Sequence, residues 1–372
     1  MSQRENVNPR REQDHRKNSR RYQKRAAARR RRNTIFIVEI VLLLILAVVL
    51  FFMSKLSKIE KTKLDMDKIE VNEDISQESQ KIMKGYQTIA MFGLDNRSNG
   101  NLSQGRSDVI MLANINNDTK EVKLVSVYRD TYLDTGDGIF QKCNAAYAKG
   151  GPEQAISMLN VNLDLNITDY VTVDFNSIIE CVDLLGGVDM EITDDEASLM
   201  TGYIRELNEL TGNKAENLTQ GGTYTLNGVQ ACAYARIRYG GGDDYRRTER
   251  QRTVLTAMVK KAQQSDLTTV NKLINEVCGD IQTSFSNAEL LALASQVFQY
   301  SIGDTTGFPF TKTTKVLSKK TGDVVIPCDL SDNVKELHIF LYEDSAYTAS
   351  DTLKQNSEKI VSDTGFKSGD GH

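Results

Sequence analysis

The residues of this chain best suited to chemistry are arginines and carboxylates that gather in a few short segments. The densest is residues 235–251, ARIRYGGGDDYRRTERQ. If Arg236 and Arg238 lie on an extended segment, their side chains share one face. If Arg247 and Gln251 lie on a helix, their spacing of four also places them on one face. Because guanidinium groups bind phosphate oxygens through paired hydrogen bonds, this segment predicts a site for a phosphate-bearing ligand.

The same segment carries acids that offer a purely structural explanation. Clustered guanidinium groups repel one another, so they need anions nearby. Asp243, Asp244 and Glu249 could provide these anions without any ligand. The sequence leaves both explanations open.

A second group of charges flanks three short apolar segments. Residues 87–94, 109–115 and 121–128 have the composition of buried strands, and residues 116–118 form a polar turn. In consecutive antiparallel strands, the end of the first, the start of the second and the end of the third lie at one edge of the sheet. The charged residues at these positions are Asp95, Arg106, Asp108, Arg129 and Asp130.

Carboxylates and arginines at one sheet edge suit a hard cation such as Mg²⁺ that holds a phosphate. Asp95 and Asp108 are the candidate metal ligands, because two carboxylates, phosphate oxygens and waters complete a six-coordinate Mg²⁺ site. Surface salt bridges would explain any one pair of these charges. Their gathering at one edge favours a binding site, in which Mg²⁺ and the phosphate ligand bind cooperatively.

Other common catalytic arrangements are absent from the sequence. The three histidines, His15, His338 and His372, are too scattered for a metal site or a Ser-His-Asp arrangement. The chain has no P-loop, no GxGxxG after a strand and no HExxH. Phosphate binding by arginines and carboxylates is therefore the main hypothesis.

The five cysteines are an odd number without close spacing, which gives no zinc ligand set and no obvious disulfide framework. Cys143, Cys181 and Cys232 occupy positions typical of a protein core, where a free thiol behaves as a small apolar group. Cys278 and Cys328 could pair, and their spacing does not decide this.

The elements that follow the three strands alternate between helix and strand. A helix opens at Gly150–Glu153, with proline in its first turn, and runs to about Leu163. Residues 170–175 and 188–192 have the pattern of strands, and residues 176–185 that of a helix ended by two glycines. This alternation predicts a layered α/β domain. Residues 195–225 are polar, and we expect an irregular excursion there.

The N-terminal part of the chain predicts a membrane anchor. Residues 34–53 form an apolar run with one charge, Glu39, and as a helix they would span about 30 Å, the thickness of a bilayer's hydrocarbon core. A buried core helix would be amphipathic, and a cleaved signal peptide would have a shorter apolar region followed by small residues. A single transmembrane helix is therefore the preferred interpretation.

The distribution of charge predicts the orientation of that helix. Residues 1–32 carry 13 Lys/Arg and three acids, which is a net charge of +10. Because the whole chain has a net charge of −4, the remaining residues carry −4 − 10 = −14. Arginines directly before the apolar run place the tail in the cytoplasm by the positive-inside rule. DNA binding by the tail is a weaker alternative.

The predicted organisation has five parts. These are a basic cytoplasmic tail (1–33), a transmembrane helix (34–53), an extracellular stalk (54–85), a catalytic domain (86–363) and a flexible tail (364–372).

Seven segments, in this order, resemble the extracellular domain of LytR-CpsA-Psr proteins. The resemblance covers about residues 86–300, and residues 325–359 are similar to the C-terminal part of some such domains. The segments are GLDNR (93–97), RSDVIML (106–112), YRDTYL (128–133), NAAYAKGGP (144–152), VDLLGGV (182–188), LNGVQACAYARIR (226–238) and DDYRRTERQ (243–251).

The resemblance implies an α/β domain in which a central mixed β-sheet, largely antiparallel at its start, lies between helices. It also implies a Mg²⁺-dependent transferase that moves an anionic glycopolymer, of the teichoic-acid or capsular type, from a polyprenyl-pyrophosphate carrier to peptidoglycan, with the lipid in an apolar tunnel. The bilayer and these substrates are the implied partners, and nucleic acid is not. A polyprenyl-pyrophosphate hydrolase and a non-catalytic envelope sensor remain the alternatives.

By motif, the resemblance assigns roles to individual residues. Asp95 and Asp108 match the Mg²⁺-associated carboxylates, and together with Arg129 they form the implied catalytic set. Two positions depart from the family pattern: Tyr128 stands where proline is usual, and Arg246 is an additional arginine. The implied pyrophosphate-binding set is Arg106, Arg129, Arg236, Arg238, Arg247 and Gln251.

Overall fold

The computed structural model describes residues 60–61, 64–94, 102, 105–238, 243–266, 269, 272–273 and 281–371. All of them belong to the second of two compact units, which begins at Leu56. The expected cytoplasmic tail and transmembrane helix, together with Asp95 and Cys278, lie outside the described residues. Within the described part, no helix is long and apolar enough to cross a membrane.

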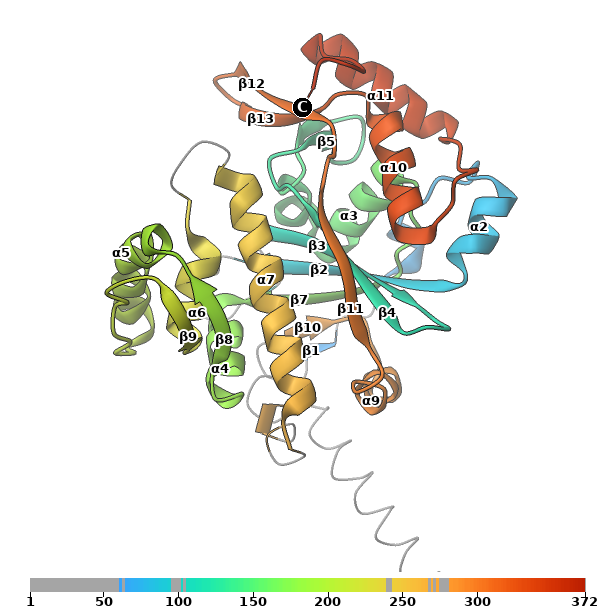
Figure 1. Cartoon of the computed structure of the whole chain (residues 1–372). Coiled ribbons are helices and arrows are strands. Elements are labelled where there is room, and N and C mark those ends of the chain that lie inside the picture. Colours follow the sequence, from blue (N-terminus) through green and yellow to red (C-terminus); the bar gives the residue numbers. More distant parts are fainter. Residues whose placement is uncertain are drawn as a thin grey trace, which may run out of the picture. The chain divides into compact units, whose positions relative to one another are not determined.

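A mixed sheet forms the centre of the domain (Figure 1). Its middle strands β2, β3 and β4 are consecutive and antiparallel, as the three apolar segments predict, while β7 and β11 run parallel to β2 and β4. In sheet order the strands are β1 (Glu60–Lys61), β10 (Ile281–Thr283), β7 (Asp169–Asp174), β2 (Tyr86–Leu94), β3 (Ser107–Asn116), β4 (Glu121–Val127) and β11 (Ser301–Phe308).

One face of the sheet is covered by helices α3, α10 and α11. Side chains that alternate along the central strands point to this side, among them Phe92 and Leu112, which are 1% and 0% exposed. They share one hydrophobic core with Leu159, Leu337 and Ile360 of the covering helices. The helices are α3 (Ala145–Leu163), α10 (Leu330–Tyr342) and α11 (Asp351–Thr364).

Helices α4, α6 and α7 lie over the opposite face, and Figure 1 shows α7 running across the strands. The helices form a second core with strands β8 and β9 and helix α5, while Ile89 and Leu124 of the sheet pack in a third core with Phe285. The elements are α4 (Phe175–Leu184), α6 (Gly228–Arg236), α7 (Asp243–Gln264), β8 (Val188–Ile192), β9 (Gly222–Leu226), α5 (Asp194–Thr211) and α9 (Asn287–Ser295).

The prediction for residues 195–225 was wrong. Most of the first half is helix α5, which begins with a capping box between Thr193 and Glu196. Its buried residues Ala197, Met200, Ile204 and Leu207 recur with helical spacing. Strand β9 then pairs with β8. Polar residues on the exposed face of α5 hid this amphipathic pattern in the sequence.

Helix α3 begins earlier than predicted, at Ala145. Gly150 and Gly151 interrupt it with non-helical backbone angles, and Gly151 has a φ of 65°. Pro152 then opens the part that the sequence predicts, which ends at Leu163. The glycine pair therefore joins two helical pieces rather than starting one helix.

The C-terminal part packs onto the segment that precedes β2. Asp164, which caps α3, accepts hydrogen bonds from Asn72, Tyr347 and Ser350. The described part of the expected 54–85 stalk is thus tied to the domain, and Ser368 of the expected tail donates to Asp332. The remaining elements are η1 (Met66–Lys68), α2 (Gln77–Met83), β5 (Tyr132–Asp134), β6 (Phe140–Lys142) and the hairpin β12 (Lys312–Ser318) and β13 (Gly322–Pro327).

Candidate active site at one edge of the sheet

The start of β3 and the end of β4 bring opposite charges together, as strand order predicts. The Nη1 of Arg129 donates to Oδ1 of Asp108 over 2.6 Å. Asp130 lies at the same edge, and its Oδ2 is 3.6 Å from Nε of Arg129. Of the five charges expected there, Arg106 is exposed just before β3, and Asp95 lies outside the described residues.

Arg129 is surrounded by carboxylates. The third of them is Asp244 of α7, whose Oδ1 is 3.9 Å from Nε of Arg129. Burial lowers the pKa of Arg129, but Asp108, Asp130 and Asp244 outweigh burial and raise that pKa. The Nε of Arg129 is nevertheless buried without a hydrogen-bond partner. Arg129 is therefore firmly charged, and one of its donors is unused.

Arg247 has the opposite balance. Its side chain is 3% exposed and forms one ion pair, between Nη2 and Oδ1 of Asp244 over 2.6 Å. None of its three guanidinium nitrogens has a partner in hydrogen-bond geometry. Burial lowers the pKa of Arg247 to about 10; Asp244 opposes this, and the charges of Arg129 and Arg238 add to it. Arg247 is a buried cation short of anions, as expected of a site for an anionic ligand.

The two adjacent arginines of this segment differ in burial. Arg246 is exposed, whereas its neighbour Arg247 is buried. Arg250 points to α5, where its Nε donates to Oε1 of Glu196 over 3.0 Å. Arg247 and Gln251 lie on one helix, one turn apart, as their spacing predicts. Arg247 is therefore the member of the RR pair that belongs to the site.

Arg236 and Arg238 do not share an extended segment, so this part of the prediction was wrong. Arg236 is the last residue of α6; its Nη2 donates to Oε1 of Glu206 over 3.2 Å, and its Cζ lies 5.3 Å from the ring centre of Phe175. Arg238 follows the helix and is exposed, and its positive charge lowers the pKa of Arg247. Arg238 is therefore close to Arg247, whereas Arg236 is tied to Glu206 of α5.

Sequence reasoning missed one charged member of the site, Lys142. It belongs to β6, and its Nζ is 3.0 Å from Oδ1 of Asp130. Its short strand gave no signal that would bring it to the edge. Asp244 was expected to act as a counterion, and it does, but its Oδ2 is also buried without a hydrogen bond.

The unusual Tyr128 has a specific packing environment. Its ring meets Tyr245 edge-on, with centroids 4.6 Å apart, and Lys312 Nζ lies 5.4 Å from the centre of the Tyr128 ring. A Cβ added to Gly307 would lie 2.1 Å from the Tyr128 hydroxyl, so β11 needs glycine at this point. Tyr128 and Tyr245 thus join the end of β4 to the start of α7, next to Arg129 and Asp244.

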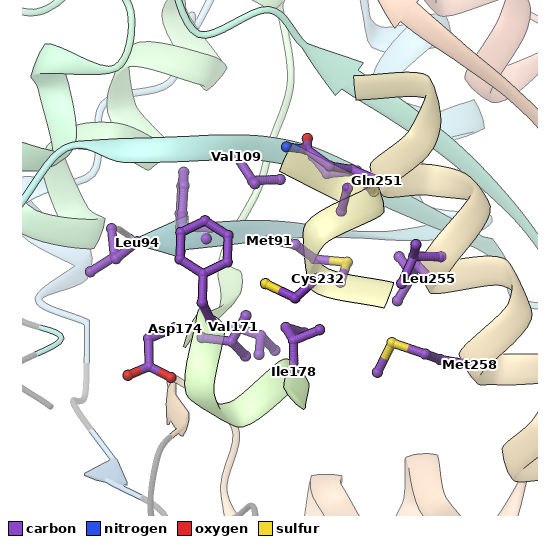
Figure 2. Close-up of a pocket in the computed structure, with 17 residues that line it drawn as sticks. Met91, Leu94, Val109, Val171, Asp174, Ile178, Cys232, Gln251, Leu255 and Met258 are labelled. Carbon is purple, nitrogen blue, oxygen red and sulfur yellow. The ribbon is translucent and has the colours of Figure 1, made fainter. Parts of the chain in front are cut away.

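An apolar cavity adjoins the charged cluster (Figure 2). It has a volume of about 110 Å³ and lies between strands β2, β3 and β7 and helices α4, α6 and α7. Gln251 lines it, one helical turn from Arg247, and the Gln251 Oε1 is buried without a partner. The other lining residues include Met91, Val109, Met111, Val171, Val173, Phe175, Ile178, Cys232, Val254, Leu255 and Met258.

The site offers carboxylate oxygens that a hard cation would accept. Asp108, Asp130 and Asp244 converge on Arg129, and the unpartnered Oδ2 of Asp244 is a free buried acceptor. Among the residues that the structure describes, no group of three acidic, His or Cys side chains has the arrangement of a metal site. Asp95 lies outside those residues.

Comparison with protein families gives one match that covers most of the chain. The sequence model of the LytR_cpsA_psr family matches residues 46–315.

Individual relatives align over about half of this chain. TagU of Enterococcus faecalis, named a polyisoprenyl-teichoic acid–peptidoglycan teichoic acid transferase, is 30% identical over 210 residues, which cover 56% of this chain and 64% of TagU. TagV of Bacillus subtilis, with the same activity in its name, is 30% identical over 51% of this chain and 48% of TagV. Biofilm regulatory protein A of Streptococcus mutans is 31% identical over 53% of this chain and 49% of its own length. The chain therefore spans about half to two thirds of these relatives.

Solved structures share the fold. TagT bound to LI-WTA is 20% identical, with a TM-score of 0.52 over 76% of this chain and 92% of TagT. Protein gbs0355 of Streptococcus agalactiae is 24% identical, with a TM-score of 0.55 over 72% of this chain and 90% of that protein. These similarities confirm the predicted α/β fold with a central mixed sheet between helices.

Proposed function

Because this chain belongs to the LytR_cpsA_psr family, we propose that it transfers an anionic glycopolymer from a polyprenyl-pyrophosphate carrier to peptidoglycan. The names of TagU and TagV support this reaction class. The observation that carries the proposal is the buried guanidinium of Arg247, which has one ion pair, with Asp244, and no other partner, and lies one helical turn from a residue that lines an apolar cavity. A charged head beside an apolar tail is the shape of a lipid pyrophosphate.

The arginine cluster supplies the contacts for the pyrophosphate. Arg247 offers its Nε and Nη1, which have no partner, Arg129 offers its Nε, and Arg238 adds an exposed charge close enough to lower the pKa of Arg247. Each charge-assisted hydrogen bond to a phosphate oxygen is roughly twice as strong as a neutral one. The ligand would restore the anions that Arg247 lacks, so its binding stabilises the site.

The apolar cavity supplies the contacts for the prenyl chain. Its sheet side consists of half-buried or buried apolar residues of β2, β3 and β7, and its helix side of Ile178, Val254, Leu255 and Met258. Burying apolar surface contributes about 25 cal/mol per Å². The cavity orients the carrier so that its pyrophosphate reaches Arg247 and Arg129.

The reaction we propose is one displacement at phosphorus. An acceptor hydroxyl oxygen forms a bond to the phosphorus that carries the polymer, and the bond from that phosphorus to the bridging oxygen breaks. Polyprenyl phosphate leaves with the electron pair, and the hydroxyl proton ends on the leaving phosphate or in solvent. Such transfer needs mainly positioning and stabilisation of charge on the phosphoryl oxygens. Arg129 and Arg247 face those oxygens in this arrangement.

Asp95 and Asp108 are the residues we propose to hold Mg²⁺, with Asp244 as a further oxygen donor. When bound, Mg²⁺ neutralises phosphate charge and helps to orient the pyrophosphate. The unpartnered oxygen of Asp244 supports an oxygen-ligated cation at this edge. Calorimetry tests this part: Mg²⁺ should tighten lipid pyrophosphate, and the lipid should tighten Mg²⁺ by the same factor, since linkage is reciprocal. If Asp108→Asn leaves the Mg²⁺ effect intact, Asp108 is no ligand.

We also propose the topology that the sequence predicts, with the tail of residues 1–33 in the cytoplasm, one spanning helix and the catalytic domain outside. The support is the charge of +10 before an apolar run. Protease added to intact protoplasts should degrade residues 86–372. Full protection of the domain would contradict this topology.

The reaction is tested with the full-length protein in detergent, a lipid-linked glycopolymer and peptidoglycan fragments. We expect polyprenyl phosphate to appear together with a phosphodiester-linked product, and both to require the peptidoglycan. Release of polyprenyl phosphate at the same rate without an acceptor would identify a hydrolase. Binding without any release would indicate a sensor.

A further inference from the structure

A second concave surface lies along α7, on the side opposite the apolar cavity. The residues of α7 that line it are Thr253, Thr256, Ala257, Lys260 and Gln264, together with Arg252 and Lys261. Their spacing places them about half a helical turn away from Gln251, Val254, Leu255 and Met258, which line the cavity. Its other walls come from Asp189 of β8 and from Ile302, Gly303 and Thr305 of β11. We call this surface the α7 groove.

The α7 groove is open and roomy, with a volume of about 590 Å³. Figure 1 shows α7 between β8 and β11, the strands that form its walls. The lining is mostly polar or charged, which suits a hydrated, hydrogen-bonding ligand rather than a prenyl chain. Its ligand class therefore differs from that of the cavity.

The charge of the groove is positive. Among its described lining residues, three cations, Arg252, Lys260 and Lys261, face one acid, Asp189. Lys261 is paired with Asp189 over 3.4 Å, and Lys260 is exposed. The chain outside its basic tail carries −14, so a local excess of positive charge on this domain stands out.

Arg252 is the most unusual of the three cations. It is 8% exposed, and its Nε and Nη1 are buried without hydrogen-bond partners. Within the described residues no carboxylate forms an ion pair with Arg252. Burial lowers the pKa of Arg252, and the electrostatic interactions with Tyr128 and Glu249 oppose this. A nearly buried guanidinium with unused donors is costly to the fold unless an anion satisfies it.

The α7 groove begins beside the candidate active site. Arg252 directly follows Gln251, so one residue belongs to the groove and its neighbour to the cavity. Tyr128, which interacts electrostatically with Arg252, directly precedes Arg129 in the sequence. From Arg252 to Lys260 the helix rises about 12 Å. An extended anionic chain that leaves the reaction centre can therefore meet several positive charges in succession.

We propose that the α7 groove binds phosphodiester groups of the polymer that is being transferred. The proposal rests on the proposed function, and it adds a site for the polymer itself, remote from the pyrophosphate. Arg252 holds the phosphate nearest the reaction centre, Lys260 and Lys261 hold later ones, and Thr253, Thr256 and Gln264 offer hydrogen bonds to hydroxyl groups. A recessed cation such as Arg252 is out of reach of a flat bilayer, which favours a flexible polymer over membrane lipid as the ligand.

The test compares two charge-matched double variants of the full-length protein. The groove variant is Lys260→Gln with Lys261→Gln. The control variant is Lys335→Gln with Lys354→Gln on α10 and α11, where Lys335 is exposed like Lys260 and Lys354 pairs with Asp351 as Lys261 pairs with Asp189. The probes are a defined glycerol-phosphate oligomer, a neutral oligosaccharide of equal length and anionic phosphatidylglycerol vesicles.

We expect the groove variant to bind the glycerol-phosphate oligomer about tenfold more weakly than wild type, with a smaller dependence on salt. The control variant should match wild type, and the neutral oligosaccharide should bind none of the proteins well. Equal loss in both variants, no loss in either, or loss of vesicle binding alone would overturn the proposal.

Activity assays separate this proposal from the proposed function. Two donors are compared, one with a polymer and one with the linkage sugars alone on the same lipid pyrophosphate. The groove variant should raise KM for the polymer-bearing donor about tenfold and leave the short donor unchanged. If wild type uses neither donor, the proposed function fails. If the groove variant uses both donors as wild type does, the groove assignment fails.

Discussion

The two faces of the central sheet are built from alternating residues of the same strands, yet they are filled differently. On the side of α3, α10 and α11, Phe92 and Leu112 are 1% and 0% exposed, and the space between the layers is packed. On the side of α6 and α7, Met91 of β2 and Val109 of β3 are partly exposed and line a cavity. The comparison suggests that one face provides stability and that the other gives up packing for a binding site.

Buried charged side chains follow the same division between the two sides of the sheet. Asp164, on the packed side, is fully buried and accepts hydrogen bonds from three side chains. Arg247, on the cavity side, is equally deep but has no partner in hydrogen-bond geometry. Buried charge that is satisfied supports a fold, whereas buried charge that is unsatisfied indicates a missing ligand.

The largest expected effect comes from Arg247. Arg247→Met should lower the transfer rate about 10²–10³-fold, because a preorganised charge contact to the phosphate is lost. Unfolding free energy should change little: the cost of burying the cation is removed, its ion pair with Asp244 is lost, and Asp244 keeps Arg129 as a second cation 3.9 Å away. Transfer assays and thermal unfolding measure the two effects. The control is Arg246→Met at the exposed neighbour, which should change neither quantity; a destabilised Arg247→Met would assign Arg247 to the fold.

The second prediction compares the two faces directly. Leu112→Ala, on the packed side, should cost about 2–5 kcal/mol of unfolding free energy, since it leaves a cavity in a closed core. Met91→Ala, on the neighbouring strand and the other face, should cost less than about 2 kcal/mol because part of its surface already faces empty space. Denaturant titration of both variants decides this. Equal losses would remove the distinction between the faces.

The sequence predicted the parts of the fold that depend on local pattern. The strands at 87–94, 109–115 and 121–128 are continuous apolar runs, and their order alone brought Asp108 to Arg129. Helix α5 was missed because its polar exposed face dominates the composition. The sequence could not tell whether Arg246 or Arg247 points into the site. The two residues lie on different faces of one helix, and only the tertiary packing decides which face is buried.

Other parts of the site depend on tertiary packing that leaves no local trace. Lys142 reaches Asp130 from a three-residue strand, β6. The α7 groove needs β11, which is separated from α7 in the sequence and joins the sheet beside β4. The space beside Tyr128 exists because Gly307 has no side chain. None of these contacts follows from spacing along the chain.

The third prediction concerns a substitution that fills the apolar cavity. Val171 is half-buried on β7 and lines the cavity. Val171→Phe should occupy part of this space and weaken binding of polyprenyl pyrophosphate about tenfold, with little change in unfolding free energy. Binding of inorganic pyrophosphate, which needs the arginines alone, serves as the internal control. Unchanged lipid binding would show that the prenyl chain lies elsewhere.

The smallest effect concerns the thiols on the two sides. Cys143 belongs to the packed core and is 0% exposed, while Cys181 of α4 is half-buried beside the second core. Burial raises the pKa of both thiols, that of Cys181 to about 11 and that of Cys143 further. The thiolate is the reactive form, and an unfolded cysteine has a pKa of about 8.5.

The rate at which Cys181 is labelled in the native protein should therefore rise about tenfold per pH unit from pH 7 to 9 without levelling, as the thiolate fraction does below its pKa. The unfolded chain should level off above its own pKa, and native Cys143 should stay unlabelled throughout. Peptide mass spectrometry resolves the two sites in one sample. Equal labelling rates for Cys143 and Cys181 would mean that the packed face opens as readily as the other, which its closed core excludes.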